Sequence, residues 1–346
     1  MVPIWYASLT EVQRAADIPS SALYDARVSN VLTQATDSVR EACNRDFEPT
    51  LATRWFPWPQ DQTQSPRRLL LGRNTLISMS AVVNGDGTAM DLADLKLVKV
   101  KTGDDGPPYN AIESAIAFCA NTQFPSRSIG ITGLYGYRND EWAITTTVSD
   151  VSGTTVDVAD SSQIGVGSII RIGDERLVVR RRGWLNSGNA ATINIDASES
   201  SDFFNVTDGT DYAPGELILI DSEQMEITDV AGNMLIVERA VNGSVLAAHT
   251  GVTLVNVNRR LTVERGVLGT TSVATLSGAT VNLFQFPGMV AQLCKGEALQ
   301  IIAQDLASYG SRAGSGQGEM SMAVRAVPEL RSRVIGRYGR LRSGAV

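Results

Sequence analysis

The chain of 346 residues contains 43% apolar and 19% charged residues, a composition that predicts a folded protein and excludes an intrinsically disordered one. Its formal net charge of −7 at pH 7 argues against a protein that binds nucleic acid through its overall charge. The charge is uneven, because residues 321–346 carry a net charge of +5 and the remaining residues about −12. A basic C-terminal segment on an acidic chain favours docking to an acidic partner.

The cysteines and the first residues of the chain indicate the cellular compartment in which the protein folds. Cys43, Cys119 and Cys294 are far apart and form no CxxC motif, which favours reduced thiols over disulfides or a metal site. The first residues lack the features of a signal peptide, and no apolar run approaches the roughly 20 residues that span a bilayer. We therefore expect synthesis and folding in the cytoplasm, without membrane association.

Two helices are predicted at the start of the chain. Ser8 and Glu11 have the spacing of a capping box, in which Ser8 caps the helix and Glu11 reaches back to it. This short helix should end near Pro19. From about Ser21 to Asp46, apolar residues recur at spacings of three and four, which predicts a longer amphipathic helix.

Residues 50–137 change to a strand-like pattern. The aromatic segment at 54–59 is expected to be extended, and predicted strands cover 69–71, 77–83, 95–100 and 128–137. Asn84-Gly85-Asp86-Gly87 predicts a hairpin turn. The same residues resemble a calcium loop only weakly, because the sixth-position glycine and the twelfth-position glutamate of such a loop are missing.

Residues 143–284 contain two internal repeats. The stretch 167–179 aligns with 215–227 at an offset of 48 residues, so that Glu175 matches Glu223. The stretch 235–243 aligns with 261–269 at an offset of 26 residues. Because simple tandem duplication gives a single offset, we infer that one β module, at about 191–257, is inserted within another. Pairing of residues 167–182 with 259–268 would support this hypothesis, and pairing of 259–284 with the inserted module alone would contradict it.

The chain is predicted to end in two helices. Pro287 begins a helix that should reach about Tyr309, and residues 310–318 form a Gly/Ser-rich flexible tether. Pro328 then begins a short helix that extends to Arg342. We do not expect this basic helix to bury against its own domain, so that deletion of 319–346 would leave the fold intact.

The sequence contains few candidates for catalysis or metal binding. His249 is the single histidine, and its place in a β repeat favours a structural role over a catalytic base. The equivalent placement of Glu175 and Glu223 favours acceptors for turn amides over an acid/base pair. Asp208 and Asp211 favour a turn, with weak cation binding as the alternative. Gly165-Val166-Gly167 and the glycines of 314–318 lack the pattern of a phosphate loop. We predict no cofactor, no metal and no enzymatic activity.

The C-terminal arginines are the strongest candidates for binding a partner. Arginines of one short helix should surround it rather than form one stripe, and they could be solvated, dock on an acidic protein surface or contact DNA phosphates. The residues proposed for docking are Arg331, Arg333, Val334, Ile335, Arg337, Tyr338, Arg340 and Arg342.

The order of motifs resembles the head–tail connector (adaptor) family of long-tailed bacteriophages. Those motifs are Trp5-Tyr6-Ala7-Ser8-Leu9 before a short helix, Arg45-Asp46-Phe47 at the end of a longer one, Ile131 to Tyr137 at a Gly/Tyr corner, and a C-terminal helix from Pro328 to Arg342. The resemblance covers roughly 1–140 and 285–346. In the middle, the chain departs from the family, because β repeats replace a short link.

The resemblance implies a structural protein of the virion neck that assembles in the host cytoplasm. It implies a homo-oligomeric ring, a dodecamer, that docks on the portal protein through the C-terminal helix. The ring would connect the portal to a tail or stopper protein, and genomic DNA would pass through its channel without sequence-specific binding. The acidic remainder of the chain suits a channel that does not hold DNA.

These observations predict an α+β fold with a helical connector body, short strands and an inserted all-β domain of two nested small modules. The predicted segments are a body at 1–142, the β domain at 143–284, a helix at 285–310, and the tether with the Arg-rich helix at 311–346. The alternative is a phage surface or tail protein whose β repeats bind a capsid, a glycan or a host surface. That alternative predicts exposed aromatic side chains in the repeats.

Overall fold

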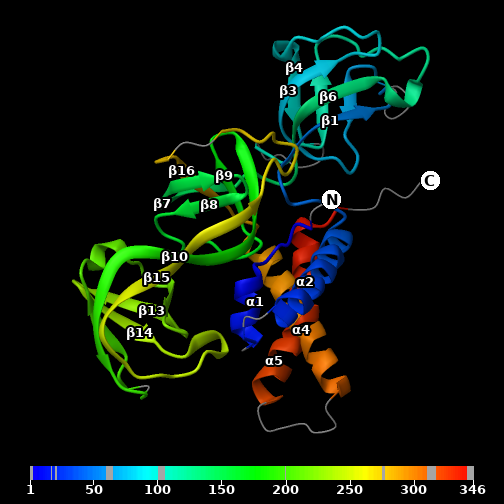
Figure 1. Ribbon diagram of the computed structural model, residues 1–346. Coiled ribbons are helices and arrows are strands. Elements are labelled where there is room, and N and C mark those ends of the chain that lie inside the picture. Colours follow the sequence, from blue (N-terminus) through cyan, green and yellow to red (C-terminus); the bar gives the residue numbers. More distant parts are fainter. Residues whose placement is uncertain are drawn as a thin grey trace. The chain divides into compact units, whose positions relative to one another are not determined.

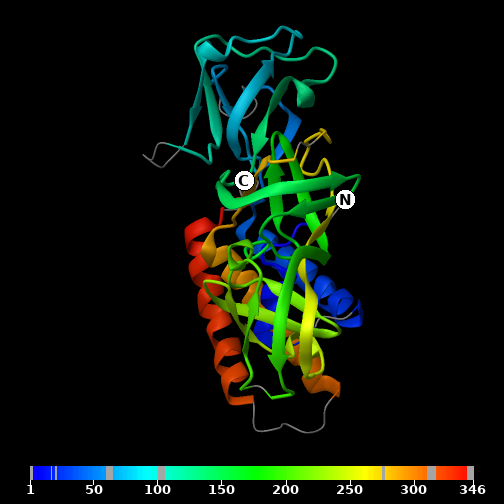
Figure 2. The ribbon, with the colours of Figure 1, turned by 60° about the vertical axis from the view of Figure 1, so that its left-hand side comes forward.

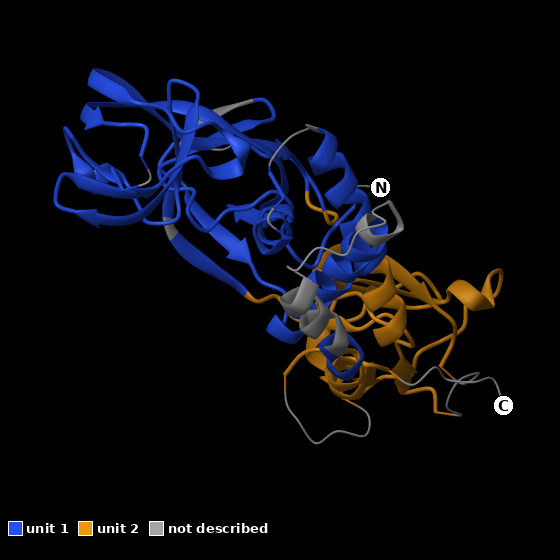
Figure 3. Cartoon of the chain, turned by 90° about the horizontal axis from the view of Figure 1, so that it is seen from below, with its two compact units in different colours: residues 1–36, 141–267, 271–330 blue, residues 37–140, 268–270, 331–346 orange. Residues whose placement is uncertain are grey.

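The computed structural model describes residues 3–16, 18–19, 22–59, 65–99, 106–198, 200–274, 277–309 and 317–340. The chain divides into two compact units (Figure 3). The first unit contains residues 1–36, 141–267 and 271–330, and the second contains residues 37–140, 268–270 and 331–346. The segment expected as an N-terminal body at 1–142 therefore contributes to both units.

The helices near the N-terminus and after the β repeats lie close to the predicted positions. They are α1 (Leu9–Ala16), α2 (Ala22–Cys43) and α4 (Gly288–Tyr309). The capping box of α1 is confirmed, because the backbone N–H of Glu11 donates to Oγ of Ser8 at 3.2 Å and the backbone N–H of Ser8 donates to Oε2 of Glu11 at 3.0 Å.

The last helix, α5 (Gln317–Tyr338), begins eleven residues before the predicted start and contains Pro328 in its interior. The prediction of a helix start at Pro328 was wrong. Glu, Met and Ala precede the proline between 319 and 327, and these residues favour a helix strongly enough to continue across it. The predicted tether falls largely on residues 310–316, outside the described residues, while 317–318 lie in α5.

The second unit is built on two antiparallel sheets. Their orders are β1-β6-β3 and β2-β5-β4. A shared core lies between the strands, with Leu69, Ile112 and Ile131 fully buried. The turn predicted at Asn84 is confirmed, since the N–H of Gly87 donates to the carbonyl of Asn84 at 2.9 Å. The strands are β1 (Thr50–Phe56), β2 (Arg68–Leu70), β3 (Leu76–Val83), β4 (Leu95–Val98), β5 (Ala111–Ser114) and β6 (Ile129–Tyr135).

The remaining strands form one continuous antiparallel array in the first unit. In sequence order they are β7 (Glu141–Ser152), β8 (Thr155–Val158), β9 (Ile169–Ile172), β10 (Glu175–Ile195), β11 (Phe203–Val206), β12 (Leu217–Ile220), β13 (Glu223–Ala231), β14 (Met234–Glu238), β15 (His249–Glu264) and β16 (Thr280–Phe284). The array closes on itself in the order β10-β11-β14-β13-β12-β15-β8-β7-β16-β9.

Two long strands divide this closed array into two modules. β10 and β15 pair with each other over most of their length, from Val178 opposite Glu264 to Ile195 opposite His249. They run from β7, β8 and β9 at one end to β13 and β14 at the other (Figure 1), and they remain side by side in the rotated view (Figure 2). Module one contains β7, β8, β9 and β16, and module two contains β11 to β14. The two modules share the β10–β15 ribbon.

Each module has its own apolar core. In module one, side chains such as Ile170, Leu177 and Leu261 are fully buried. In module two, Ile218, Ile227 and Val257 are fully buried. Alternate residues of the shared strands enter these cores, since successive side chains of a strand point to opposite faces. Burial of apolar side chains stabilises each module separately by about 1.5–3 kcal/mol per side chain.

The strand pairing matches the register that nesting requires. Residues 178–182 pair with 261–264, so the front of module one meets its back half across the insertion of module two. β7 and β16 also pair, with Glu141 opposite Phe284. The chain therefore enters and leaves the β region at neighbouring points, as expected for an insertion that does not disturb its flanking elements.

The predicted fold class was wrong. About 39% of the chain lies in strands and 24% in helices, so the fold is mostly β rather than a helical body with a small β insertion. The physical reason is twofold. Residues 50–137 use their apolar residues to fill a core between sheets, and the β repeats merge into one large array instead of forming an appendage.

Candidate functional site

The proposed docking residues lie on opposite faces of α5. Val334 is fully buried and Tyr338 is 7% exposed, whereas Ile335 is 39% exposed. Arg333 and Arg337 are exposed and one helical turn apart, so they lie on the same outward face. The expectation that this helix would not bury against its own domain was wrong, because its arginines leave an apolar stripe through Val334 and Tyr338.

The other arginines of this segment are anchored within the second unit. Arg331 donates from Nη1 to Oγ of Ser38 at 3.0 Å. The backbone N–H of Arg340 donates to the carbonyl of Cys43 at 3.0 Å, and its Nη1 donates to the carbonyl of Gly72 at 2.6 Å. Burial lowers the pKa of Arg340. Arg342 lies outside the described residues.

Three aromatic rings from distant parts of the sequence meet beside α5. The ring centroids of Phe47 and Tyr137 are 5.6 Å apart, those of Phe47 and Tyr338 are 5.9 Å apart, and those of Tyr137 and Tyr338 are 5.5 Å apart. The rings are tilted or edge-to-face, a geometry that adds about 0.5–1.5 kcal/mol per pair beyond area burial. We call these three side chains the aromatic triad.

A half-buried arginine completes the surroundings of the triad. The guanidinium of Arg45 lies 5.0 Å from the ring centroid of Tyr137. Burial and the nearby charge of Arg340 lower the pKa of Arg45 to about 10, so it is still a cation at neutral pH. The C-terminal segment is thus held in the second unit by the aromatic contacts of Tyr338 and by the hydrogen bonds of Arg331 and Arg340.

In the β modules, Glu223 is the centre of a buried ion pair. Arg239 donates to it from Nε at 3.0 Å and from Nη2 at 2.8 Å, and the backbone N–H groups of Ala240 and Ala247 donate at 3.2 and 3.1 Å. His249 lies 2.8 Å from Glu223 through Nε2 and 2.9 Å from Asp221 through Nδ1. Burial raises the pKa of Glu223, but hydrogen bonds from Arg239 and His249 outweigh it and lower the pKa below its usual value.

The same arrangement recurs around Glu175 in module one. Arg265 donates to Glu175 from Nε at 3.0 Å and from Nη2 at 2.6 Å, and the N–H groups of Gly266 and Val273 donate at 2.9 and 3.0 Å. Burial opposes these hydrogen bonds, and the net effect is a lowered pKa of Glu175. The predicted role of both glutamates as acceptors for turn amides is confirmed.

The arginine partners of these glutamates were missed in the sequence, although a signal was present. Arg239 and Arg265 occupy equivalent positions in the 26-residue repeat, just as Glu175 and Glu223 do in the 48-residue repeat. When a glutamate and an arginine recur together in both copies of a module, they are expected to form the same ion pair in each copy. We call each Glu–Arg pair with its turn amides a clamp.

The remaining sequence candidates take structural positions. His249 is buried within the module-two clamp. Asp208 accepts from the N–H and Oγ1 of Thr210 at 2.9 and 2.7 Å, which confirms a turn and lowers the pKa of Asp208. Asp211 accepts from Nδ2 of Asn189 at 2.6 Å. Within the described residues, no cluster of three or more His, Cys, Asp or Glu could hold a metal ion.

The β repeats differ from a surface lined with exposed aromatic rings. Tyr212 is 6% exposed and its hydroxyl lies 3.0 Å from Oγ of Ser187, and Trp184 is half-buried. Phe203 is exposed. This distribution gives little support to the alternative in which the repeats bind a glycan by stacking.

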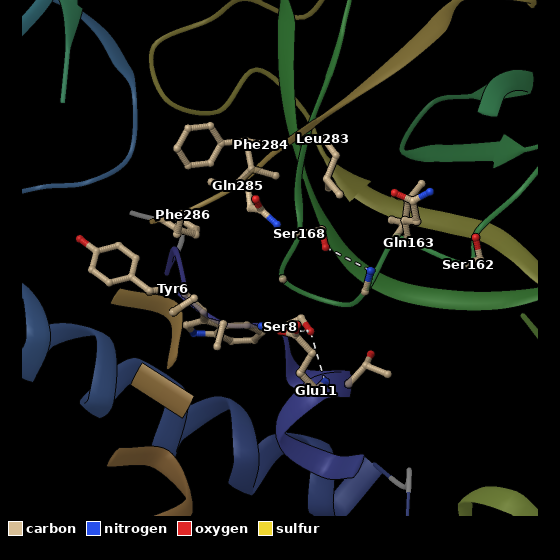
Figure 4. A pocket seen from close by; sticks show the side chains of 18 of the residues that line it. Tyr6, Ser8, Glu11, Ser162, Gln163, Ser168, Leu283, Phe284, Gln285 and Phe286 are labelled. Carbon is tan, nitrogen blue, oxygen red and sulfur yellow. Dashed lines mark hydrogen bonds between the residues drawn. The ribbon is translucent and has the colours of Figure 1, made fainter. Parts of the chain in front are cut away.

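A cavity of about 460 Å³ lies in the first unit between the start of α1, the loop before β9 and the segment after β16 (Figure 4). Gly167, with φ of +96°, allows this loop to approach Trp5, since a Cβ there would lie 2.7 Å from the indole ring. Two polar groups at the cavity have protein partners: Ser8 with Glu11, and Oγ of Ser168 with the N–H of Gly165.

The comparisons with known proteins gave no match. No protein family, no curated protein and no solved structure matches this chain. Among the described residues, no helix combines the length and apolar character needed to cross a bilayer. The candidate site therefore rests on the geometry of the chain itself.

Proposed function

We propose that the chain is a structural neck protein of a tailed bacteriophage, a ring-forming adaptor that docks on the portal protein. It would connect the portal to a tail or stopper protein and leave a channel for genomic DNA. The proposal rests on the order of motifs in the sequence. One structural observation, the contact among the three rings of the aromatic triad, supports the proposal.

Each residue of the triad belongs to a different motif of the resemblance. Phe47 ends the Arg-Asp-Phe motif, Tyr137 ends the Gly/Tyr corner, and Tyr338 lies in the C-terminal helix. The motifs were identified only by their order along the chain. Chance matches would have no reason to meet in space, so their contact supports the view that they form one structural element.

The N-terminal motif is packed in a similar way in the first unit. Nε1 of Trp5 donates to Oγ1 of Thr33 at 3.0 Å, and the backbone N–H of Tyr6 donates to Oγ1 of Thr36 at 3.2 Å. The ring of Tyr6 lies 4.7 Å from that of Phe286, directly before α4. The motif thus joins α2 to the segment that follows the β insertion.

The docking surface proposed from this geometry is smaller than the whole helix. Val334 and Tyr338 are used inside the chain, whereas Arg333 and Arg337 are exposed on one face. An arginine pair of this kind suits carboxylates on a partner, because each guanidinium can bind a carboxylate through two parallel hydrogen bonds. We propose that Arg333 and Arg337 contact an acidic surface of the portal.

Charge reversal of this face tests the proposal. Biolayer interferometry with immobilised portal protein of the same virus would compare wild type with the double variant Arg333→Glu/Arg337→Glu. We expect binding to weaken by about tenfold or more, since like charges now meet at the interface. The matched control Arg67→Glu/Arg127→Glu changes the charge equally on exposed residues of the second unit and should bind as wild type.

Two results would contradict the proposal. Equal binding of the Arg333→Glu/Arg337→Glu variant and wild type would show that this face does not dock. Absence of any binding between wild type and portal would remove the adaptor function itself. Deletion of 319–346 is a poorer test than the sequence suggested, because it also removes Val334 and Tyr338 from the protein interior.

A further inference from the structure

A second cavity, of about 340 Å³, lies in the first unit where α1 and α2 face β10. Arg180, Arg181 and Arg182 follow one another on β10 and all line it. The β10–β15 ladder changes register between Val179 and Arg181 and again after Gly183. Such irregularities redirect side chains, and here they turn a run of arginines toward one cavity. The volume falls in the range typical of small-ligand sites.

Arg182 is half-buried, and its hydrogen bonds are to neutral acceptors. Its Nη2 donates to Oγ of Ser161 at 2.8 Å and to the carbonyl of Asn258 at 3.1 Å. Among the described residues it forms no ion pair within 4.0 Å. Glu216, Asp160 and Glu226 act on it electrostatically. Glu216 is held by Arg259 at 2.7 and 2.6 Å, and Glu226 by Arg14 at 2.6 Å. A buried cation without a paired anion is unfavourable.

Two further buried polar atoms beside the cavity make no hydrogen bond within the described part of the chain. One is Nη2 of Arg180, whose Nε donates to Glu264 at 3.2 Å and whose Nη1 donates to the carbonyl of Pro3 at 3.2 Å. The other is Oδ1 of Asn258, a cavity-lining residue that is 8% exposed. Buried polar groups of folded proteins are nearly always satisfied. Nη2 of Arg180 therefore points to a missing acceptor, which an oxyanion supplies, whereas Oδ1 of Asn258 requires a donor and gives no support to an anion.

The acidic residues of the cavity are already occupied. Asp25 accepts from Nε2 of Gln13 at 2.6 Å, and Glu226 accepts from Nη2 of Arg14 at 2.6 Å. The cavity is thus lined by four arginines and two carboxylates, so its lining side chains carry more positive than negative charges. Burial lowers the pKa of Arg182 to about 10, which still leaves the side chain charged at neutral pH.

We propose that this cavity binds a small molecule with an oxyanion group, a phosphate or a carboxylate, held by the guanidinium groups of Arg182 and Arg180. Guanidinium groups match the geometry of both anions through paired hydrogen bonds. The indole rings of Trp5 and Trp184, which also line the cavity, provide apolar walls for the rest of the molecule. This site is distinct from the docking face on α5 and does not depend on the adaptor function.

Isothermal titration of the full chain tests the site, with sodium phosphate and sodium succinate as separate probes at an ionic strength fixed by sodium chloride. We expect saturable binding of at least one probe with one site per chain. The probe that binds more tightly identifies the anion class. The variant Arg182→Gln should weaken binding at least tenfold, whereas Arg68→Gln, on β2 of the second unit, should bind as wild type.

The absence of saturable binding of both probes to wild type would overturn the proposal, as would unchanged affinity in Arg182→Gln. Circular dichroism checks that Arg182→Gln folds. Should that variant not fold, Arg180→Gln removes the second guanidinium of the site. Its affinity should also fall at least tenfold, and affinity equal to wild type would contradict the assignment.

Discussion

Arginines serve two different purposes in the β modules and in α5. In the modules, Arg239 and Arg265 are each bound through two nitrogens to a buried glutamate. In α5, Arg333 and Arg337 are exposed on one face of the helix. The two arginines that recur in the repeats therefore support the fold, whereas Arg333 and Arg337 lie at the surface. Recurrence of both charges in a duplicated module indicates a structural role for these two arginines.

The two clamps are themselves unequal. The side chain of Arg239 is 1% exposed and that of Arg265 is 18% exposed, while both glutamates are fully buried. Module two also adds His249 to its clamp, and the chain has no second histidine to play that part in module one. The stability of module two should therefore depend more strongly on Glu223 than the stability of module one depends on Glu175.

The largest expected effect is from Glu223→Ala. This substitution leaves Arg239 as a buried cation without its carboxylate, and the loss of one partner of a buried ion pair costs about 3–5 kcal/mol. Urea unfolding would measure the change. Glu175→Ala should cost less, because Arg265 can reach solvent, and the exposed Glu238→Ala serves as the control. Equal losses in both clamp variants would contradict the inequality of the modules.

Tyr338→Ala should have the next largest effect. It removes a buried ring that contacts two others, and truncation of a buried aromatic side chain costs about 3 kcal/mol. The neighbouring Ile335→Ala, at a residue that is 39% exposed, should cost well under half as much. Thermal unfolding followed by near-ultraviolet circular dichroism reports on the aromatic rings. A Tyr338→Ala variant with the same unfolding temperature as wild type would mean that the triad does not hold α5.

Acid should weaken the clamps. The pKa values of Glu175 and Glu223 are lowered in the folded protein relative to the ordinary value of 4.5. Their contribution to the free energy of unfolding is therefore complete above about pH 4.5 and is lost as the pH falls toward the folded pKa values. Stability measured across this range should fall less steeply in Glu175→Gln/Glu223→Gln than in wild type. Parallel curves would contradict the clamp assignment.

The smallest effect on stability should come from the exposed face of α5. Arg333→Glu/Arg337→Glu changes exposed residues, and such substitutions usually alter the free energy of unfolding by less than about 0.5 kcal/mol each. The guanidinium of Arg337 lies 5.7 Å from the ring centroid of Tyr338, and loss of this exposed contact adds about 0.5–1 kcal/mol. Arg331→Ala, which removes a hydrogen bond to Ser38, should cost more. Guanidinium chloride unfolding separates the two cases. A large loss of stability in the double variant would show that Arg333 and Arg337 support the fold, as Arg239 and Arg265 do.

Local features were predictable from the sequence where a short-range rule decides them. The capping box at Ser8 and Glu11, the turn at Asn84 and the helix after Pro287 follow from neighbouring residues alone. The start of α5 was not predictable in this way, because the helix propensity of the residues before Pro328 outweighed the tendency of proline to end a helix. The overall class was also missed, since it depends on how strands from 50–137 and from the repeats pair over long distances.

The candidate sites show the same division. The arginines of α5 were visible as a charge cluster, but their separation into buried and exposed faces required the positions of Phe47 and Tyr137. The cavity arginines were overlooked, although three in succession are conspicuous. What makes Arg182 unusual is the absence of a carboxylate partner among the described residues, and pairing across 43 or more residues, as between Arg259 and Glu216, is not readable from sequence.

The mass of the intact assembly tests the central claim most directly. Native mass spectrometry would measure the full chain alone and mixed with the portal protein of the same virus. The adaptor function predicts a closed homo-oligomer, a dodecamer by resemblance to the connector family, that forms either alone or on the portal and binds it with fixed stoichiometry. A chain that stays monomeric in both samples and leaves the mass of the portal unchanged would contradict it.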